Sequence, residues 1–276
     1  MNAAIDFGIT NIDAVAEADG TLHRWTRPAA GAPDPALVRS VLAEGGVDFD
    51  SIRQLAVTGG RHRQLPARIE NCAVVGVNEI PAIGRGGLAL AELIGENARE
   101  PWIVISAGSG TAAVSARGDE YAHVTGSAVG GGTLIGLSRL ILRTVDPHEI
   151  DALAQNGDPN GADLALSDVI GGPIGSLPPE ATAVNFGRLA RHALNVSRED
   201  LAAALVTLVG QVIAVTAINA ARAEKIDRVI FIGHLTDMLS IRKTIARVGE
   251  FYSLPLTVPP DTGYATAIGA LRHLSK

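Results

Sequence analysis

Two short segments far apart in the chain share one pattern, and this repeat constrains the fold more than any other feature. The segment "IDFGITN" at residues 5–11 aligns with "ISAGSGT" at residues 105–111, which pairs Gly8 with Gly108. Each segment reads as an apolar strand, a bend that contains glycine, and a return strand. Hairpins often look alike, so a chance likeness over seven positions stays open. A true repeat predicts a duplicated domain with a cleft between its halves.

Strand patterns alternate with helical patterns along the chain, and this alternation predicts an α/β fold. The expected strands cover residues 3–7, 12–16, 54–60, 72–79 and 227–235, and a further hairpin covers 101–116. The expected helices cover residues 34–44, 81–98, 133–144 and 197–223, and "DTGYATAIGALRHL" closes the chain with a glycine turn and a helix of small residues.

The expected helix at residues 197–223 is apolar on nearly all sides, with Ser197 as its N-cap and Asp200 three residues further on. Such a helix is buried, either in a core or in a subunit interface. It carries more apolar surface than one core face requires, so we expect a homodimer.

Composition narrows the class of protein. The 276 residues are 47% hydrophobic and 19% charged, which is typical of a globular protein. The net charge of −6 argues against nucleic acid or an anionic membrane as the main partner. Cys72 is the only cysteine, so an internal disulfide and a thiolate zinc site are excluded. With no leader pattern and no apolar run of membrane-spanning length, we expect a soluble cytoplasmic protein.

Four glycine-containing loops lie where a strand ends or a helix starts. Bare backbone amides and a helix N-terminus can close on a phosphate, although turns and tight packing use glycine too. The loops cover Gly8–Asn11, Gly108–Thr111, Gly130–Thr133 and Gly233–His234.

Two carboxylates stand at positions where chemistry is expected. Asp6 lies inside an apolar strand, where an unpaired charge is costly, and it can be paired structurally or hold Mg²⁺ through water beside a nucleotide. Glu79 is expected to end a strand ahead of Pro81. It can stabilise a helix N-terminus, or it can act as the general base in phosphoryl transfer.

The order of motifs along the chain resembles the type II pantothenate kinases. The likeness rests on "AGSGTAAV", "HVTGSAVGGGTLIGL", "DLALSDVIGG", "ATAVNFGRLA", "VIFIGHL", "GYATAIGAL" and "NEIPAIGRG". The resemblance implies an actin-like ATPase (ribonuclease H-like) fold, in which duplicated α/β domains enclose a nucleotide cleft. The implied division is an N-terminal part at 1–98 and a C-terminal part at 99–276 with the dimerisation helices. The implied activity is ATP-dependent phosphorylation of pantothenate, the first step towards coenzyme A, in a homodimer, with Mg²⁺ as cofactor and acyl-CoA as a feedback ligand.

Carried over by position, the resemblance assigns roles to individual residues. Glu79 would be the catalytic base. The residues that would face ATP, its phosphates and Mg²⁺ are Asp6, Gly8, Thr10, Asn11, Ser109, Gly110, Gly130, Gly131, Gly132, Thr133, Gly233 and His234, with Asp6 as the residue that holds the metal. Thr111 and the position of His123 would contact the acceptor.

Three positions depart from the family pattern. Ile9 replaces a glycine of the first loop, Asp13 stands where the family has Lys, and His123 stands where an Arg binds the acceptor's carboxylate. Arg61 and Arg63 are expected at a strand end near the cleft, where they either replace that cation or are only solvated. Arg85 is a weaker candidate. Two further functions therefore stay open: a kinase of the same fold for another small alcohol or acid, and an inactive regulator that binds nucleotide or acyl-CoA.

Overall fold

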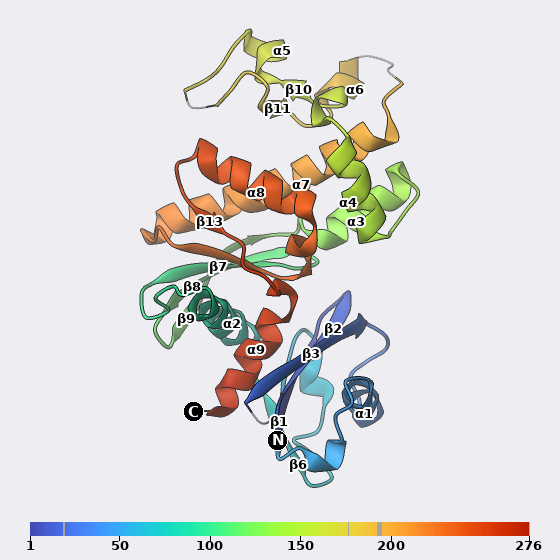
Figure 1. The fold of residues 1–276 in the computed structure, drawn as a ribbon, viewed down its shortest axis with the longest axis vertical. Helices are drawn as coiled ribbons and strands as arrows, with labels where there is room; N and C mark the ends of the chain where they lie inside the picture. The colour runs from blue at the N-terminus through green and yellow to red at the C-terminus, as the bar shows by residue number, and fades with distance from the viewer. Residues whose placement is uncertain (19, 176, 192–194, 276) are drawn as a thin grey trace.

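The computed structural model describes residues 1–18, 20–175, 177–191 and 195–275. Figure 1 shows an elongated molecule in which two α/β halves are stacked along the long axis, with both chain termini in the lower half. The repeated hairpins of the sequence lie at the centre of these halves.

The first half is built on a six-stranded sheet with the order β3-β2-β1-β4-β6-β5. Strands β1, β2 and β3 form an antiparallel meander, and β4 and β6 run parallel to β1. The outer face packs on α1 (Pro35–Glu44) through Val38, Val41 and Leu42. The strands are β1 (Asn2–Phe7), β2 (Asn11–Ala18), β3 (Thr21–Pro28), β4 (Gln54–Thr58), β5 (Arg68–Ile69) and β6 (Cys72–Gly76).

The second half repeats this arrangement in a five-stranded sheet with the order β13-β12-β7-β8-β9. Strands β7, β8 and β9 are an antiparallel meander, and β12 runs parallel to β7 just as β4 runs parallel to β1. The repeat and the expected α/β class are therefore confirmed. The strands are β7 (Trp102–Ala107), β8 (Thr111–Arg117), β9 (Glu120–Ser127), β12 (Val229–Ile232) and β13 (Leu256–Thr257).

Two helices fill the space between the sheets. Helix α2 (Glu79–Leu93) packs on the second sheet, and α9 (Ala265–Leu271) packs on α2 and on β1, β2 and β4 of the first sheet. Together with Ala4, Val15, Ala56, Val104 and Ile230 they form one buried cluster. The C-terminal helix thus returns to the first sheet, and the expected domain boundary at residue 98 stays a prediction.

The outer face of the second sheet is covered by four helices, which Figure 1 shows above it. They are α3 (Gly131–Ile141), α4 (Pro147–Asn156), α7 (Arg198–Glu224) and α8 (Leu239–Phe251). Helix α7 has the length and composition of a membrane span, but most of that stretch is buried inside the protein. It contacts α3, α4 and α8, so it serves as a core helix.

A small cap extends the second half at the top of Figure 1. It contains a two-stranded sheet and is organised by the buried Asp163, whose carboxylate accepts hydrogen bonds from Thr182, Asn185 and the Phe186 amide. Its elements are β10 (Leu164–Ala165), α5 (Leu166–Ile170), β11 (Thr182–Val184) and α6 (Gly187–Arg191). Short 3-10 helices elsewhere are η1 (Phe49–Ser51), η2 (His62–Gln64), η3 (Pro159–Gly161), η4 (His234–Asp237), η5 (Thr262–Tyr264) and η6 (Arg272–Ser275).

Several expected boundaries were wrong. Glu79 does not end a strand, because β6 stops at Gly76 and Glu79 opens α2, two residues ahead of Pro81. Helix α2 ends at Leu93 because Gly95 follows with φ +82°. Helix α3 starts at Gly131 and ends at Ile141, where residues 133–144 were expected. The strand expected over 227–235 is the shorter β12.

Candidate functional site

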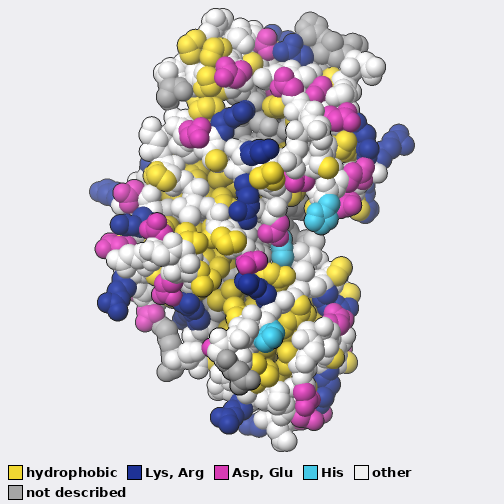
Figure 2. Space-filling model, viewed as in Figure 1, with side chains coloured by type: hydrophobic (Ala, Val, Ile, Leu, Met, Phe, Trp, Pro, Cys, Tyr) yellow, Lys and Arg dark blue, Asp and Glu magenta, His cyan; other side chains and the backbone are white. Residues whose placement is uncertain are grey.

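The carboxyl ends of the central strands of both sheets point towards one cleft between the two halves. This cleft has a volume of about 760 Å³ and is lined by the bends of both repeated hairpins. Figure 2 shows acidic and histidine side chains where the molecule narrows between its halves. The predicted site residues that line the cleft are Asp6, Gly8, Thr10, Asn11, Glu79, Ser109, Gly110, Thr111, Gly131, Gly132, Gly233 and His234.

The two hairpin bends meet across the cleft. The Thr10 and Ser109 hydroxyl oxygens are 2.8 Å apart and share a hydrogen bond. The Thr111 hydroxyl donates to the Val129 carbonyl at 2.8 Å, which fixes the start of β8 to the loop ahead of α3. The sequence repeat therefore places two equivalent bends opposite each other, as a ligand held between the halves requires.

The three consecutive glycines ahead of α3 allow a close approach to the second bend. The amides of Gly131 and Gly132 donate to the carbonyls of Gly108 and Ser109 at 2.8 and 2.9 Å. A Cβ at Gly130 would lie 2.8 Å from the Gly110 Cα and from the Ser109 carbonyl oxygen. The Gly131 and Gly132 amides therefore already donate to backbone carbonyls. This corrects the expectation that they are free to bind an anion. Gly130 and Thr133 are not among the residues that line the cleft, and phosphate binding by Gly130–Thr133 stays a prediction.

Asp6 is one of the carboxylates that line the cleft. Strand register places it between Asp13 of β2 and Thr58 of β4, on the sheet face that looks towards the second half. Burial raises the pKa of Asp6, the charges of Asp13 and Glu79 add to this rise, and His234 opposes it, so that the pKa is about 8. Among the described residues no donor forms a hydrogen bond with this carboxylate. An oxygen ligand without a cation fits Mg²⁺, which binds carboxylates and waters.

Glu79 stands beside this carboxylate as the first residue of α2. It is exposed and lines the cleft, and its charge acts on Asp6. A carboxylate at the N-terminus of a helix interacts favourably with the helix dipole. The geometry supplies a carboxylate that is open to a ligand in the cleft, as a general base requires.

Gly59, at the end of β4, leaves room for Asp6, and this gives a testable prediction. Its φ is +89°, and a Cβ there would lie 2.6 Å from Asp6 Oδ1 and 2.5 Å from the Phe7 carbonyl oxygen. We expect Gly59→Ala to destabilise the protein by roughly 1–3 kcal/mol and to displace the Asp6 carboxylate. Gly60→Ala is the matched control, since a Cβ at Gly60 meets nothing within 4 Å. Urea unfolding of both variants measures the difference, and equal stabilities would contradict the prediction.

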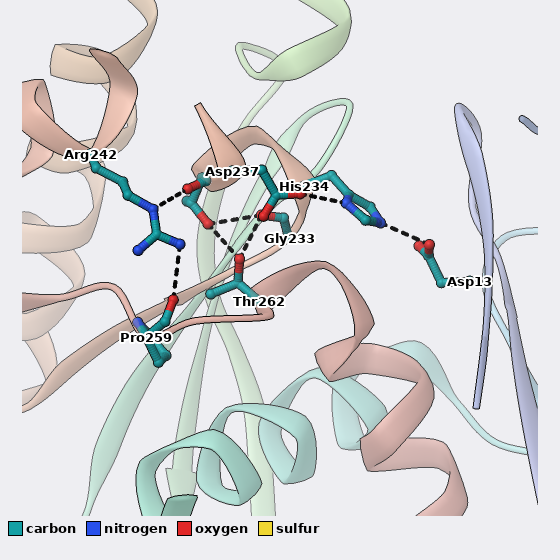
Figure 3. A network of polar contacts seen from close by, with 8 residues as sticks. Asp13, Gly233, His234, Asp237, Arg242, Pro259 and Thr262 are labelled. Atoms are coloured by element: carbon teal, nitrogen blue, oxygen red, sulfur yellow. Dashed lines mark hydrogen bonds and ion pairs between the residues drawn. The ribbon is translucent and has the colours of Figure 1, made fainter. Parts of the chain in front are cut away.

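His234 follows Gly233 at the end of β12 and lies between two carboxylates (Figure 3). Its Nε2 lies 2.8 Å from Asp13 Oδ1, and its Nδ1 lies 2.7 Å from Asp237 Oδ2. Burial alone would lower the pKa of His234, but the hydrogen bonds and charges of Asp13 and Asp237 raise it to about 10. The ring is therefore protonated at neutral pH. Both its nitrogens are bound to the protein, and its expected contact with the nucleotide stays a prediction.

The charged His234 makes stability depend on pH. Because its pKa is about 10 in the folded protein and 6.5 in the unfolded chain, its contribution is complete below pH 6.5 and is lost as pH rises through 10. The raised pKa of Asp6 also makes the free energy of unfolding fall as pH rises, but this contribution is lost by about pH 8. We expect the free energy of unfolding to fall between pH 8 and 10, and to fall less in His234→Asn. Denaturant unfolding without nucleotide measures both, and parallel curves for the two proteins would contradict the prediction.

The cations predicted from the sequence for an acidic acceptor do not line the cleft. Arg61 and Arg63 are exposed and do not line the cleft, although Gly59 and Gly60 beside them do. Arg63 donates to the Asn78 side chain, the neighbour of Glu79, at 3.2 Å. His123 is exposed on β9 and does not line the cleft either. The acceptor roles of all three residues stay predictions.

Two arginines differ from expectation. Arg85 lines a separate cavity of about 610 Å³ with Glu17 and Tyr121, so the suggestion that it faces the acceptor is wrong. Arg139 of α3 lines the cleft and was missed, because its exposed position on the helix gives no signal in the sequence. The sequence comparison marks Asp13 only as a departure from the family pattern. Its place in a strand of apolar residues was the signal that it needs a partner.

Solved structures share this architecture. An activator of 2-hydroxyisocaproyl-CoA dehydratase from Clostridium difficile with bound ADPNP superposes with a TM-score of 0.68 at 17% identity, over 99% of this chain and 93% of that one. A putative N-acetylglucosamine kinase from Porphyromonas gingivalis gives a TM-score of 0.58 at 18% identity, over 99% of both chains. The repeated halves and the cleft between them define an actin-like ATPase fold.

Sequence similarity narrows the class further. The Fumble family model matches residues 91–273, and the chain belongs to this family, which is that of the type II pantothenate kinases. A type II pantothenate kinase from Bacillus cereus is 29% identical over 227 residues, which cover 81% of each chain. The chain is a phosphotransferase that acts on an alcohol group.

Proposed function

We propose that this chain transfers the γ-phosphate of ATP to the hydroxyl group of a small hydroxy acid, with pantothenate as the preferred acceptor. This reaction would be the first step of coenzyme A biosynthesis. The observation that carries the proposal is Glu79, an exposed carboxylate that lines the cleft together with Asp6 and the two hairpin bends.

The proposed reaction is a direct in-line transfer. Glu79 accepts the proton of the acceptor hydroxyl, the hydroxyl oxygen forms a bond to the γ-phosphorus, and the bond from that phosphorus to the bridging oxygen of ADP breaks. The bends at Gly8–Asn11 and Gly108–Thr111 would hold the phosphates between them. Asp6 would hold Mg²⁺ through water, and the ion neutralises phosphate charge when it is bound. Closure of the halves would exclude water.

An acidic acceptor needs a cation, because an unpaired carboxylate in a cleft is costly. The described residues that line the cleft supply Arg139 and His234, and His234 is already held by two carboxylates. Arg63 lies one contact away, at Asn78. We propose that Arg63, with Arg61 beside it, binds the acceptor's carboxylate once an acceptor is present. If neither arginine contributes to acceptor binding, a kinase for another small alcohol becomes the better description.

The experiment that tests the acceptor is ADP release with a panel of small alcohols, pantothenate and its neutral alcohol analogue included. We expect pantothenate to give the highest kcat/KM, and Arg63→Ala to raise its KM about tenfold or more, since a charge-assisted hydrogen bond contributes roughly 1.5–3 kcal/mol. Arg53→Ala, at the opposite end of strand β4, is the matched control. Faster turnover of neutral alcohols, with no effect of Arg63→Ala, would move the assignment to another acceptor.

A homodimer is proposed on the apolar stripe of α7. Leu201, Leu208, Val212 and Val215 lie at helical spacing and stay partly exposed in the described structure. A second copy would cover them. We expect a dimer in sedimentation velocity at micromolar concentration and a monomer for Leu208→Glu. Lys243→Glu, at an exposed position of α8, should stay dimeric. A monomeric parent protein would contradict this proposal.

We propose a cytoplasmic location for this kinase, which localisation of a tagged chain would test.

We also propose that acyl-CoA inhibits the kinase as a feedback ligand. Adding acetyl-CoA to the assay tests this, and inhibition that rising ATP concentration overcomes would support it.

The alternative function is that of a regulator. A chain that binds ATP and acyl-CoA but releases no ADP with any acceptor would be such a regulator.

A further inference from the structure

A histidine from the second half is held in the cleft as the link to a carboxylate of the first. Its ring lies between Asp237 on its own turn η4 and Asp13 on β2 (Figure 3). The Asp13 side chain is 9% exposed and that of His234 26%. This pair is therefore shielded from solvent far more than an ordinary surface ion pair.

The second half is shaped to hold the ring in this orientation. A Cβ at Gly263 would overlap the His234 ring, so only glycine fits there. Tyr264 meets the ring edge-on, with 5.7 Å between ring centres. The turn that carries Gly263 is tied to η4 by the Thr236–Thr262 hydroxyl hydrogen bond of 2.7 Å and by the Gly233 amide. His234 therefore belongs rigidly to the second half.

The first half depends on this contact. Asp13 stands opposite Asp6 in the β1–β2 ladder, close to the bend at Gly8–Asn11. Without His234, Asp13 would be a nearly buried carboxylate beside Asp6 and across from Asp237, and unpaired buried charges of this kind are strongly destabilising. Any movement of β2 away from the second half would break the hydrogen bond between Asp13 and His234.

We propose that Asp13 and His234 form a clamp that sets the separation of the two hairpin bends, and that both act as positioning residues for the nucleotide. The clamp holds β2 against the second half, so that the bends of β1–β2 and β7–β8 meet the phosphates together. The nucleotide part of this inference rests on the proposed kinase function, whereas the clamp itself does not. His234 does not act as a catalytic residue, because Asp13 and Asp237 occupy both of its ring nitrogens.

The separation of the halves can be measured without any nucleotide. Spin labels on Ala36→Cys in α1 and Ala246→Cys in α8, both exposed, report the distance between the halves in a Cys72→Ser background. We expect one narrow distance in the parent protein, and a longer or broader distribution in His234→Ala and in Asp13→Asn. Asp13→Asn keeps the shape of the side chain, so it tests the clamp even where His234→Ala folds poorly.

Chemical rescue separates a clamp from a merely structural residue. In His234→Ala the Asp13 and Asp237 carboxylates face the space of the lost ring, and added imidazole should bridge them and restore the narrow distance. The double variant with Asp13→Asn should not respond to imidazole. Arg24→Gln is the matched control, because the Arg24–Asp261 ion pair of 2.9 Å also joins β3 to the turn ahead of η5 but is 37% and 50% exposed. We expect Arg24→Gln to change the distance between the halves little.

Loss of the clamp should change the KM values of the two substrates unequally. The clamp variants should raise the KM for ATP about tenfold, the scale of one charge-assisted hydrogen bond, and change the KM for the acceptor less. Unchanged distances in both clamp variants, or no response to imidazole in His234→Ala, would overturn the inference. A chain that phosphorylates no acceptor would leave the distance result standing, so failure of the clamp and failure of the kinase function are distinguishable.

Discussion

Replacing Glu79 with Gln should reduce turnover by about two orders of magnitude or more and leave nucleotide binding unchanged, as expected for loss of a general base. The amide keeps the shape of the side chain at the start of α2 but cannot take the proton of the acceptor hydroxyl. The exposed position of Glu79 means that the change should not disturb the fold. Steady-state kcat at saturating ATP measures the loss, and calorimetric titration with a non-hydrolysable ATP analogue measures binding.

Glu92→Gln is the control for this variant. Glu92 lies on the same helix near its other end, where it pairs with Arg272 at 2.6 Å, outside the cleft. Losing this exposed ion pair should cost little, and turnover should stay near that of the parent protein. If Glu79→Gln turned over as fast as Glu92→Gln, Glu79 would have no part in the mechanism.

The second large effect is expected at Asp6. ATP with Mg²⁺ should raise the melting temperature, because a ligand at a hundred times its Kd stabilises the folded state by about 2.7 kcal/mol. Asp6→Asn should abolish most of that rise. Since the pKa of Asp6 is about 8, the free protein at pH 7 already holds this side chain mainly neutral, and Asn should not lower its stability.

Thermal unfolding of both proteins with and without millimolar Mg²⁺ and ATP gives four melting temperatures. The expected pattern is a large difference for the parent protein alone. An equal rise in Asp6→Asn would remove Asp6 from the nucleotide site. No rise in either protein would count against any kinase assignment for this chain.

Local patterns in the sequence were sufficient to predict the repeated hairpins. Short apolar runs that end in glycine indicated β1 with β2 and β7 with β8, and a carboxylate inside such a run marked Asp6. The helices α1, α2 and α7 were found because their apolar residues recur at helical spacing over ten residues or more. Features that depend on a few neighbouring residues were therefore accessible from the sequence.

Features that depend on contacts between distant residues were not accessible from the sequence. Strands β3 and β9 are mostly exposed and polar, so they lack the apolar alternation of a half-buried strand. The partner of Asp13 is His234, 221 residues away, and no local pattern joins them. The glycines ahead of α3 suggested an anion site, but packing against Gly108 and Ser109 occupies two of their amides. Arg85 lines a cavity separate from the cleft because of the way α2 packs. The spacing between Glu79 and Arg85 in the sequence did not reveal this.

We propose that the cleft transfers phosphate from ATP to a small alcohol with Glu79 as the base. Phosphorus NMR of the purified chain with ATP, Mg²⁺ and pantothenate tests it most directly. We expect one new phosphate-monoester signal that grows in step with ADP and that is absent in Glu79→Gln. ATP that binds but yields no phosphate ester with pantothenate or with any alcohol of the panel, or an ester that forms equally in Glu79→Gln, would contradict it.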